Sequence, residues 1–264
     1  MRSRTMDATY REVQNPLDEL ARGRARATVW RDWCEACAIA LANAGALQDE
    51  VWHAREERYK AILANYPKDA QALFPKAFGA LQRCFESQPF ADHLGTIYMM
   101  AMSTGEKGQF FTPYNISLLT ARATLEHAEL PPDRNLVIGE PSCGSGGMLI
   151  ATCQVLHERG IDFQAHVDLH GDDIDWCCVH MATIQLSLIG ARAWLRQGDS
   201  LTYDFAVGRH ERNFETPFTW MGPLVGKFRR HEPWTEAAPA AEPPRARAEN
   251  AAPVKKKAGQ LSLF

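Results

Sequence analysis

A glycine-rich turn near the middle of the chain has the residue types and spacing of a ligand-binding site. The segment GEPSCGSGGML, residues 139–149, stands where a strand-like apolar run ends and a helical pattern begins. Gly144, Gly146 and Gly147 allow the backbone to approach a ligand closely and to adopt positive φ angles, and a helix N-terminus offers free N–H groups. The spacing differs from the dinucleotide-binding pattern, and no Lys-Ser/Thr pair follows as in phosphate-binding loops. We therefore predict a ligand above this turn, with a tight strand-to-helix connection as the plainer alternative.

Acidic side chains follow the next two strand-like runs. Asp172, Asp173 and Asp175 lie in HGDDID, one crossover unit after the glycine turn. An acidic residue at the carboxyl edge of a parallel sheet can accept two hydrogen bonds from a ribose diol. Asp175 could equally cap the helix that follows. Asp199, in QGDSL, is placed to accept a hydrogen bond from an adenine amino group, although alone it would indicate only a turn.

These motifs need a parallel sheet to bring them together. From residue 135 to residue 197, short apolar runs alternate with helical segments, which is typical of strand, helix, strand units in an α/β fold. Residues 17–86 have a helical pattern, and residues 90–102 form an apolar helical run. The Gly-rich STGEKG after that run predicts a loop that leads into QFFTP. We expect a helical N-terminal region ahead of the sheet.

The bulk composition indicates an ordinary intracellular protein and does not select a partner. The 264 residues are 45% hydrophobic and 23% charged, and the net charge of -3 neither supports nor excludes DNA binding. Seven cysteines without a repeating frame favour a reducing compartment. No apolar run resembles a signal peptide or a membrane span, so we expect a cytoplasmic protein without a membrane partner. Cys34 and Cys37 lack a second pair at zinc-site spacing and are expected to be core residues.

Four motifs in order make the sequence resemble a known family. GQFFTP at 108–113, GEPSCGSGGML, HGDDID and GDSL have the order and rough spacing of the adenine-specific (N-6) DNA methyltransferases, particularly the modification subunits of type I restriction-modification systems. The resemblance covers roughly residues 90–201. It implies a bacterial protein with a Rossmann-like α/β methyltransferase core on a shortened parallel sheet, S-adenosyl-L-methionine as cofactor, and both DNA and a second restriction-modification subunit as partners. The expected domains are a helical N-terminal region (1–88), a methyltransferase-like domain (89–231) and a tail (232–264).

The resemblance also implies roles for individual residues. In that family the Thr-Pro loop, here Thr112 and Pro113, closes over the methionine part of the cofactor, and the glycine turn holds the methionine end. An acid in the place of Asp173 holds the ribose, and one in the place of Asp199 contacts the cofactor adenine. No metal site is implied. The implied cofactor-binding residues are Phe111, Thr112, Pro113, Glu140, Ser142, Gly144, Gly146, Gly147, Asp173 and Asp199.

One catalytic element of the family is missing from the sequence. Family members carry Asn-Pro-Pro-Tyr/Phe after the GDSL motif, where the Asn and a Pro carbonyl polarise the target amino group and the ring stacks on the flipped base. The nearest segment here is Glu215-Thr216-Pro217-Phe218, followed by Trp220. Phe218 is the expected stacking residue and the catalytic prediction, and an edge strand packed by aromatic residues is the alternative.

The chain also leaves little room for the rest of such an enzyme. One or two strands fit between Asp199 and residue 232, and no target-recognition domain remains. Two functions therefore stay open. The first is a DNA adenine-N6 methyltransferase that works with a second polypeptide, and the second is a catalytically impaired accessory module that binds cofactor or DNA and is recruited to the replication sliding clamp.

The last segment of the chain differs from the rest in composition. Residues 232–259 are rich in Pro, Ala and charge, which predicts a disordered tether. The final QLSLF resembles the short peptide with which bacterial replication and repair proteins bind the DNA polymerase sliding clamp. Gln260, Leu261, Leu263 and Phe264 are the implied contacts. A frayed hydrophobic end is the alternative.

Overall fold

The computed structural model describes residues 2–44, 46–102, 110–131, 135–201 and 214–217. The chain divides into two units, residues 1–229 and residues 230–264, and the described residues all belong to the first. The expected tether and the residues of QLSLF, Gln260 to Phe264, therefore lie outside the described part, as does Phe218.

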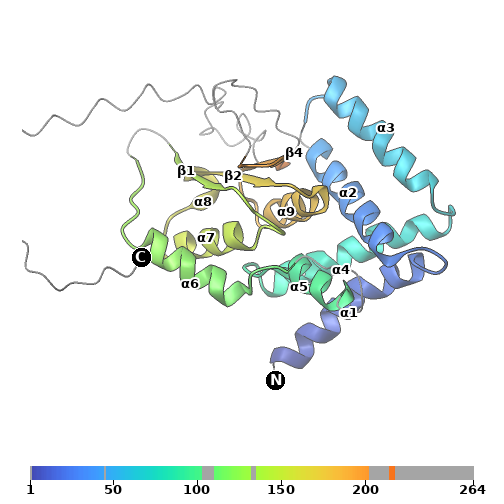
Figure 1. The fold of residues 1–264 in the computed structure, drawn as a ribbon, viewed down its shortest axis with the longest axis horizontal. Helices are drawn as coiled ribbons and strands as arrows, with labels where there is room; N and C mark the ends of the chain where they lie inside the picture. The colour runs from blue at the N-terminus through green and yellow to red at the C-terminus, as the bar shows by residue number, and fades with distance from the viewer. Residues whose placement is uncertain (1, 45, 103–109, 132–134, 202–213, 218–264) are drawn as a thin grey trace, which may run out of the picture. The chain divides into compact units, whose positions relative to one another are not determined.

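Helices occupy the N-terminal part of the described chain (Figure 1). They are α1 (Arg2–Leu20), α2 (Arg26–Ala44), α3 (Glu50–Ala64), the short 3-10 turn η1 (Ala70–Ala72) and α4 (Leu73–Ser87). Helix α1 packs on α4, and α2 packs on both α3 and α9. Apolar residues at helical spacing make these contacts: Trp33 of α2 is fully buried, and its ring N–H donates to the carbonyl of Phe74. Asp49 accepts from the N–H of Trp52 and so caps α3.

Two further helices lead to the sheet. Helix α5 (His93–Met102) is the apolar run that the sequence predicts to be helical, and α6 (Tyr114–Leu125) begins directly after Pro113. Helix α6 packs along α7 (Gly147–Glu158), the helix that the glycine turn opens. The described part of QFFTP, residues 110–113, directly precedes α6, and the glycine turn directly precedes α7, so two segments predicted to contact a ligand stand before neighbouring helices.

The sheet has the strand order β1-β2-β3-β4. Strands β1 (Leu136–Glu140), β2 (Val167–Asp173) and β3 (Ala193–Gln197) run parallel, joined through α7 and α8 (Phe163–His166) and then through α9 (Trp176–Leu188). Helix α9 packs on β2 and β3, and Figure 1 shows α7 and α9 on one side of the sheet. This is a Rossmann-like α/β fold with a short parallel sheet, and the expected fold class is confirmed.

Strand β2 alternates between apolar and polar residues. Val167 and Leu169 are fully buried on the face that α9 covers. On the other face, Asp172 stands opposite Arg196 of β3, and His170 stands opposite Trp194 with the two rings stacked. The second face of this sheet is therefore built from cross-strand polar and aromatic pairs rather than from an apolar layer.

Strand β4 (Phe214–Glu215) pairs antiparallel with β3 at the edge of the sheet. Thr216 follows it, and its hydroxyl donates to the carbonyl of Ala191 and accepts from the N–H of Ala193. Both partners lie at the amino end of β3, whereas ligands of open parallel sheets bind at the carboxyl ends. For residues 214–217 the structure has the edge-strand arrangement, and the ring of Phe214 packs edge-on against His180.

All seven cysteines lie within the described residues. All seven cysteines are free and buried, including Cys34 and Cys37, as expected of core residues. In the part of the chain that the structure describes, no group of His, Cys, Asp or Glu has the arrangement of a metal site. None of the described helices has the length and apolar character to cross a membrane.

Candidate functional site

A cavity of about 440 Å³ lies at the carboxyl ends of β1 and β2. The segment before α6, the end of β1, the glycine turn and the end of β2 all contribute to its wall. Seven of the ten residues that the family resemblance implies for cofactor binding line this cavity: Phe111, Thr112, Glu140, Ser142, Gly144, Gly147 and Asp173.

The glycine turn takes the conformation that its composition predicts. Gly144 and Gly146 have φ angles of +53° and +93°, in the left-handed region that favours glycine. A β-carbon at Gly144 would lie 3.1 Å from the ring of Phe111, so this ring lies against the turn. A β-carbon at Gly146 would lie 3.3 Å from Ala182 of α9. At Gly144 a side chain would crowd Phe111 in the cavity wall. At Gly146, which does not line the cavity, a side chain would crowd α9, so this glycine is needed for packing.

Asp173 ties the end of β2 to the glycine turn. One of its carboxylate oxygens accepts from the N–H of Gly144 at 2.9 Å, and the other accepts from the N–H of Asp175 at 2.9 Å. The backbone adds a second tie, because the N–H of Cys143 donates to the carbonyl of Asp172. A carboxylate offers about four acceptor positions, so Asp173 keeps capacity for the hydroxyls of a ligand in the cavity.

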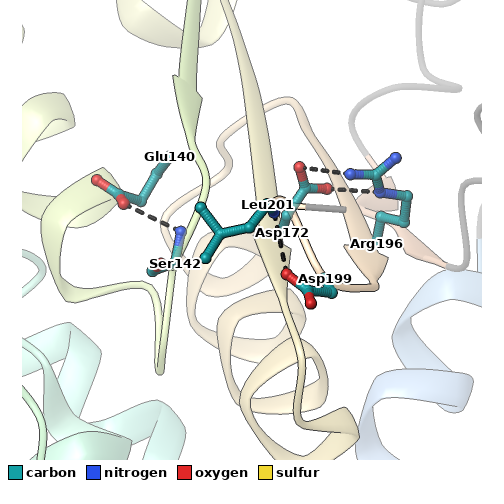
Figure 2. Close-up of polar contacts among 6 residues, drawn as sticks. All are labelled: Glu140, Ser142, Asp172, Arg196, Asp199 and Leu201. Carbon is teal, nitrogen blue, oxygen red and sulfur yellow. Dashed lines mark hydrogen bonds and ion pairs between the residues drawn. The ribbon is translucent and has the colours of Figure 1, made fainter. Parts of the chain in front are cut away.

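The neighbouring acids have other partners (Figure 2). Asp172 forms a two-pronged ion pair with Arg196, with both N–O distances 2.8 Å. Asp175 caps α9 by accepting from the N–H of Cys177, which is the alternative that the sequence left open for it. Asp173 is thus the only acid of the HGDDID motif that lines the cavity.

Asp199 lies at the same edge of the sheet but outside the cavity wall. It is exposed, and its carboxylate accepts from the N–H of Leu201 at 2.9 Å, which forms a local turn (Figure 2). The preceding Gly198 donates its N–H to the carbonyl of Asp173. Asp199 is therefore held next to the ribose-binding candidate, beyond the enclosed part of the site.

The segment before α6 covers the glycine turn. Phe111 is half-buried and packs edge-on against Tyr98 of α5, with ring centroids 5.5 Å apart. Thr112 is exposed and lines the cavity, whereas Pro113 stands at the start of α6 outside it. Phe110 also lines the cavity and remains 88% exposed, which leaves an aromatic surface free for a ligand.

Glu140 and Ser142 form the end of β1 and the start of the turn. The carboxylate of Glu140 accepts from the N–H of Ser142 at 3.2 Å, and both residues line the cavity (Figure 2). This contact shapes the chain just before the glycines.

The wall of the cavity is acidic and aromatic. Asp92, Glu140 and Asp173 bring three carboxylates to it, and no lysine or arginine is found among the described residues that line it. Such a cavity favours a cation and disfavours a phosphate. Two thiols also face it, and burial with the nearby Asp173 raises the pKa of both Cys143 and Cys178. These cysteines therefore stay protonated and act as small apolar wall residues.

Asp92 is the residue of this site that sequence reasoning missed. It is 5% exposed, directly precedes α5 and accepts a hydrogen bond from Ser145 at the centre of the glycine turn. In the sequence, Asp92 looks like an ordinary cap before the apolar run HLGTIYMMAM. Only the folded chain shows that its carboxylate also reaches the turn.

Two larger hollows lie elsewhere on the described surface. One, of about 800 Å³, lies between the end of α4 and α8, at the amino end of the sheet, where open α/β folds do not bind ligands. The other, of about 840 Å³, lies between α2, α3 and the start of α9. Neither is lined by the glycine turn at 144–147 or by any residue predicted for cofactor binding, so the smaller cavity is the candidate functional site.

Residues 91–216 match the family model of the N-6 DNA methylases. This part of the chain, a little under half of its length, is similar to the N-6 DNA methylase family. The match begins next to Asp92 and ends at Thr216, so it includes the whole cavity wall and all four strands. No curated protein matches the chain.

Two solved structures are similar to the chain. One is a putative class I S-adenosylmethionine-dependent methyltransferase from Listeria monocytogenes, with 14% identity and a TM-score of 0.47 over 76% of this chain and 55% of that one. The other is the methyltransferase subunit of a type I restriction-modification system from Streptococcus thermophilus, with 18% identity and a TM-score of 0.40 over 76% of this chain and 40% of that one. The chain thus spans about half the length of these proteins or less.

S-adenosylmethionine is the cofactor of the N-6 DNA methylase family, and the cavity residues fit it. The cofactor has a positive sulfonium and a positive ammonium, which suit a wall with three carboxylates and no described cation. Its ribose diol needs acceptors, which Asp173 offers, and its carboxylate needs N–H donors, which a glycine turn at a helix N-terminus offers.

Proposed function

We propose that this chain is the cofactor-binding part of a DNA methyltransferase that methylates the N6 amino group of adenine. The observation that supports it is the single cavity that the glycine turn, Asp173 and Phe111 share at the carboxyl edge of the sheet. Bound S-adenosylmethionine supplies the reaction with a methyl group on a positively charged sulfur.

The chain's own residues bind and orient that cofactor. Asp173 accepts hydrogen bonds from the ribose, and the N–H groups of the glycine turn hold the methionine carboxylate. Phe111 and Thr112 cover the site and exclude water, which keeps the carboxylates of the wall effective in a less polar environment. Asp199, beside the cavity, contacts the cofactor adenine.

Methyl transfer also needs acceptors for the amino group of the target base. The sequence has no Asn-Pro-Pro element, and no Asn or Gln side chain is found among the described residues of the cavity wall. We therefore assign these acceptors to a second subunit, with Phe218 as the stacking residue from this chain. Catalysis depends on acceptors aimed at the charge that develops during transfer, so the isolated chain is expected to bind cofactor far better than it transfers methyl groups.

A binding experiment tests the cofactor assignment first. The full chain is titrated with S-adenosylmethionine by calorimetry, with ATP and NAD as control ligands. We expect binding of S-adenosylmethionine alone, because the acidic wall repels phosphate groups. Binding of ATP or NAD in its place would contradict the assignment.

A transfer experiment then tests the reaction. Duplex DNA is incubated with the chain and cofactor labelled in the methyl group, beside a control duplex in which every adenine already has a methyl group at N6. Label that appears only in the first duplex, as N6-methyladenine, supports the proposal. Label in cytosine would contradict it.

The second candidate function is an accessory module that binds cofactor without transferring its methyl group. The observation that favours it is the hydrogen bonding of Thr216 to Ala191 and Ala193, which holds the Glu215-Thr216-Pro217 segment at the amino end of β3. Cofactor binding with no transfer to any duplex, even when a partner subunit is added, would support this module. Recruitment to the sliding clamp through Gln260 to Phe264 remains a prediction from the sequence.

A further inference from the structure

A buried carboxylate joins three separate elements beside the cavity. One oxygen of Asp92 accepts from the N–H of Gly95 at 2.9 Å and from the side-chain amide of Gln185 at 2.8 Å. The other oxygen accepts from the hydroxyl of Ser145 at 2.6 Å. Helix α5, the glycine turn and α9 thus meet at one side chain, which also lines the cavity.

Gln185 completes the network from α9. Its amide N–H₂ also donates to the carbonyl of Ser145 at 2.6 Å, and its carbonyl oxygen accepts from the N–H of Leu94 at 2.9 Å. Both the hydroxyl and the carbonyl of Ser145 are therefore held. Because Ser145 is the middle residue of the turn, the network fixes the backbone that a cofactor would contact.

The space around Asp92 is tight, and two helices begin there. A β-carbon at Gly95 would lie 2.1 Å from a carboxylate oxygen of Asp92, and one at Gly147 would lie 3.1 Å away. Gly95 lies in the first turn of α5, and Gly147 is the first residue of α7. The positive ends of two helix dipoles favour a negative charge at this point. Among the described residues, no lysine or arginine forms an ion pair with Asp92.

We propose that Asp92 determines specificity for the charge state of the cofactor, an inference that rests on the proposed function. S-adenosylmethionine and its product S-adenosylhomocysteine differ by one methyl group and one positive charge on sulfur. A buried carboxylate in the wall attracts the sulfonium and has no charge to attract in the thioether. Asp92 therefore favours binding of the substrate and release of the product.

The size of the cavity sets the expected effect. A cavity of about 440 Å³ has a radius of about 5 Å if it is treated as a sphere. Every atom of an enclosed ligand then lies within about 10 Å of any one residue in the wall, Asp92 included. At that distance, and with an effective dielectric constant of about 20, one charge pair changes a binding constant by about tenfold.

The test compares the two ligands on two variants of the full chain. Asp92→Asn removes the charge and keeps the shape, and the Asn can accept from Gly95 and donate to the hydroxyl of Ser145. Ser145→Ala removes one hydrogen bond of the network and keeps the charge. The dissociation constants of S-adenosylmethionine and S-adenosylhomocysteine are measured by calorimetry for each, with thermal unfolding as the check of folding.

We expect the preference for S-adenosylmethionine over S-adenosylhomocysteine to fall about tenfold in Asp92→Asn and to stay unchanged in Ser145→Ala, which weakens both ligands equally. An unchanged preference in Asp92→Asn would overturn the inference alone. The ligand preference of the unaltered chain is a second test, and no folding defect of a variant affects it. Equal affinity of the unaltered chain for the two ligands would also overturn the inference. Failure of the unaltered chain to bind either ligand would instead overturn the proposed function.

Discussion

Replacement of Asp173 by Ala tests the centre of the proposed cofactor site. The change removes two hydrogen bonds, from the N–H groups of Gly144 and Asp175, each 2.9 Å long. A hydrogen bond to a charged group contributes about 1.5 to 3 kcal/mol net, and both donors are only half-buried, so water replaces part of each bond. We therefore expect a loss of about 3 kcal/mol in the free energy of unfolding, which leaves an average domain folded.

The effect on the cofactor is separate from the effect on folding. Asp173→Ala removes the proposed acceptor for the two ribose hydroxyls, and we expect this to cost a further 3 kcal/mol or so, which corresponds to roughly 150-fold in the dissociation constant. Calorimetric titration with S-adenosylmethionine measures this loss, and urea unfolding measures the loss of stability. The affinity is compared at a temperature well below the unfolding midpoint of the variant.

Asp172→Ala is the matched control for this prediction. Asp172 is the adjacent carboxylate of the same strand, but it pairs with Arg196 and does not line the cavity. A partly exposed ion pair contributes about 1 kcal/mol, so we expect a small loss of stability and a cofactor affinity within about twofold of the unaltered chain. Equal loss of affinity in the two variants, or no loss in Asp173→Ala, would refute the placement of the ribose.

Three further predictions concern the rest of the chain. Arg192→Met removes the ion pair, 2.7 Å long, between Arg192 and the fully buried Asp168. We expect the free energy of unfolding, measured in urea, to fall by about 3 to 5 kcal/mol. The double variant with Asp168→Leu should recover most of this loss. Burial lowers the pKa of His180, stacked on Trp176, from 6.5 to about 4, so the unfolded chain binds a proton that the folded chain does not between these values. The free energy of unfolding should therefore be highest above pH 6.5 and fall by about 1 to 3 kcal/mol as the pH drops to about 4. Thermal unfolding of His180→Phe should lack this part of the pH dependence. Deletion of residues 260–264 should abolish binding of the full chain to an immobilised bacterial sliding clamp, whereas unchanged binding would remove that role.

The central part of the site could be predicted from the sequence because it follows from topology. Glycines after β1 and an acid at the end of β2 must meet at one edge when the two strands are parallel neighbours. The structure brings Gly144 and Asp173 within one hydrogen bond of each other. Local rules also sufficed for Asp175, whose side chain caps the next helix, as a residue two positions before Cys177 can do.

Features that depend on distant contacts could not be predicted in this way. Asp92 and Gln185 are separated by 93 residues, and nothing in the sequence indicates that their side chains meet at Ser145. The position of Asp199 outside the cavity depends on the turn that its own carboxylate forms with Leu201. The direction of β4 was equally inaccessible, because two residues of strand have no periodicity from which to choose an edge or an orientation.

The second face of the sheet, as far as the structure describes it, carries polar side chains. On β2, the residues Asp168, His170 and Asp172 alternate with buried apolar ones, and their partners come from β3 or from directly before it. Cross-strand pairs of this kind provide partners for the polar side chains on the described part of this face. Alternation in VDLHGDD was visible in the sequence and is typical of a strand with one apolar face rather than two.

In the proposed function, cofactor binding and base chemistry are carried by separate parts. Every described residue of the cavity wall comes from the segment 92–178, and the hydrogen bonds of its central network also close within the described residues, through Gln185 of α9. Cofactor affinity should therefore not depend on any strand beyond β3. The acceptors for the target amino group are different, because they have to reach the sulfonium from outside that wall. A second subunit that supplies them should raise the rate of methyl transfer by orders of magnitude while it leaves the dissociation constant of S-adenosylmethionine nearly unchanged.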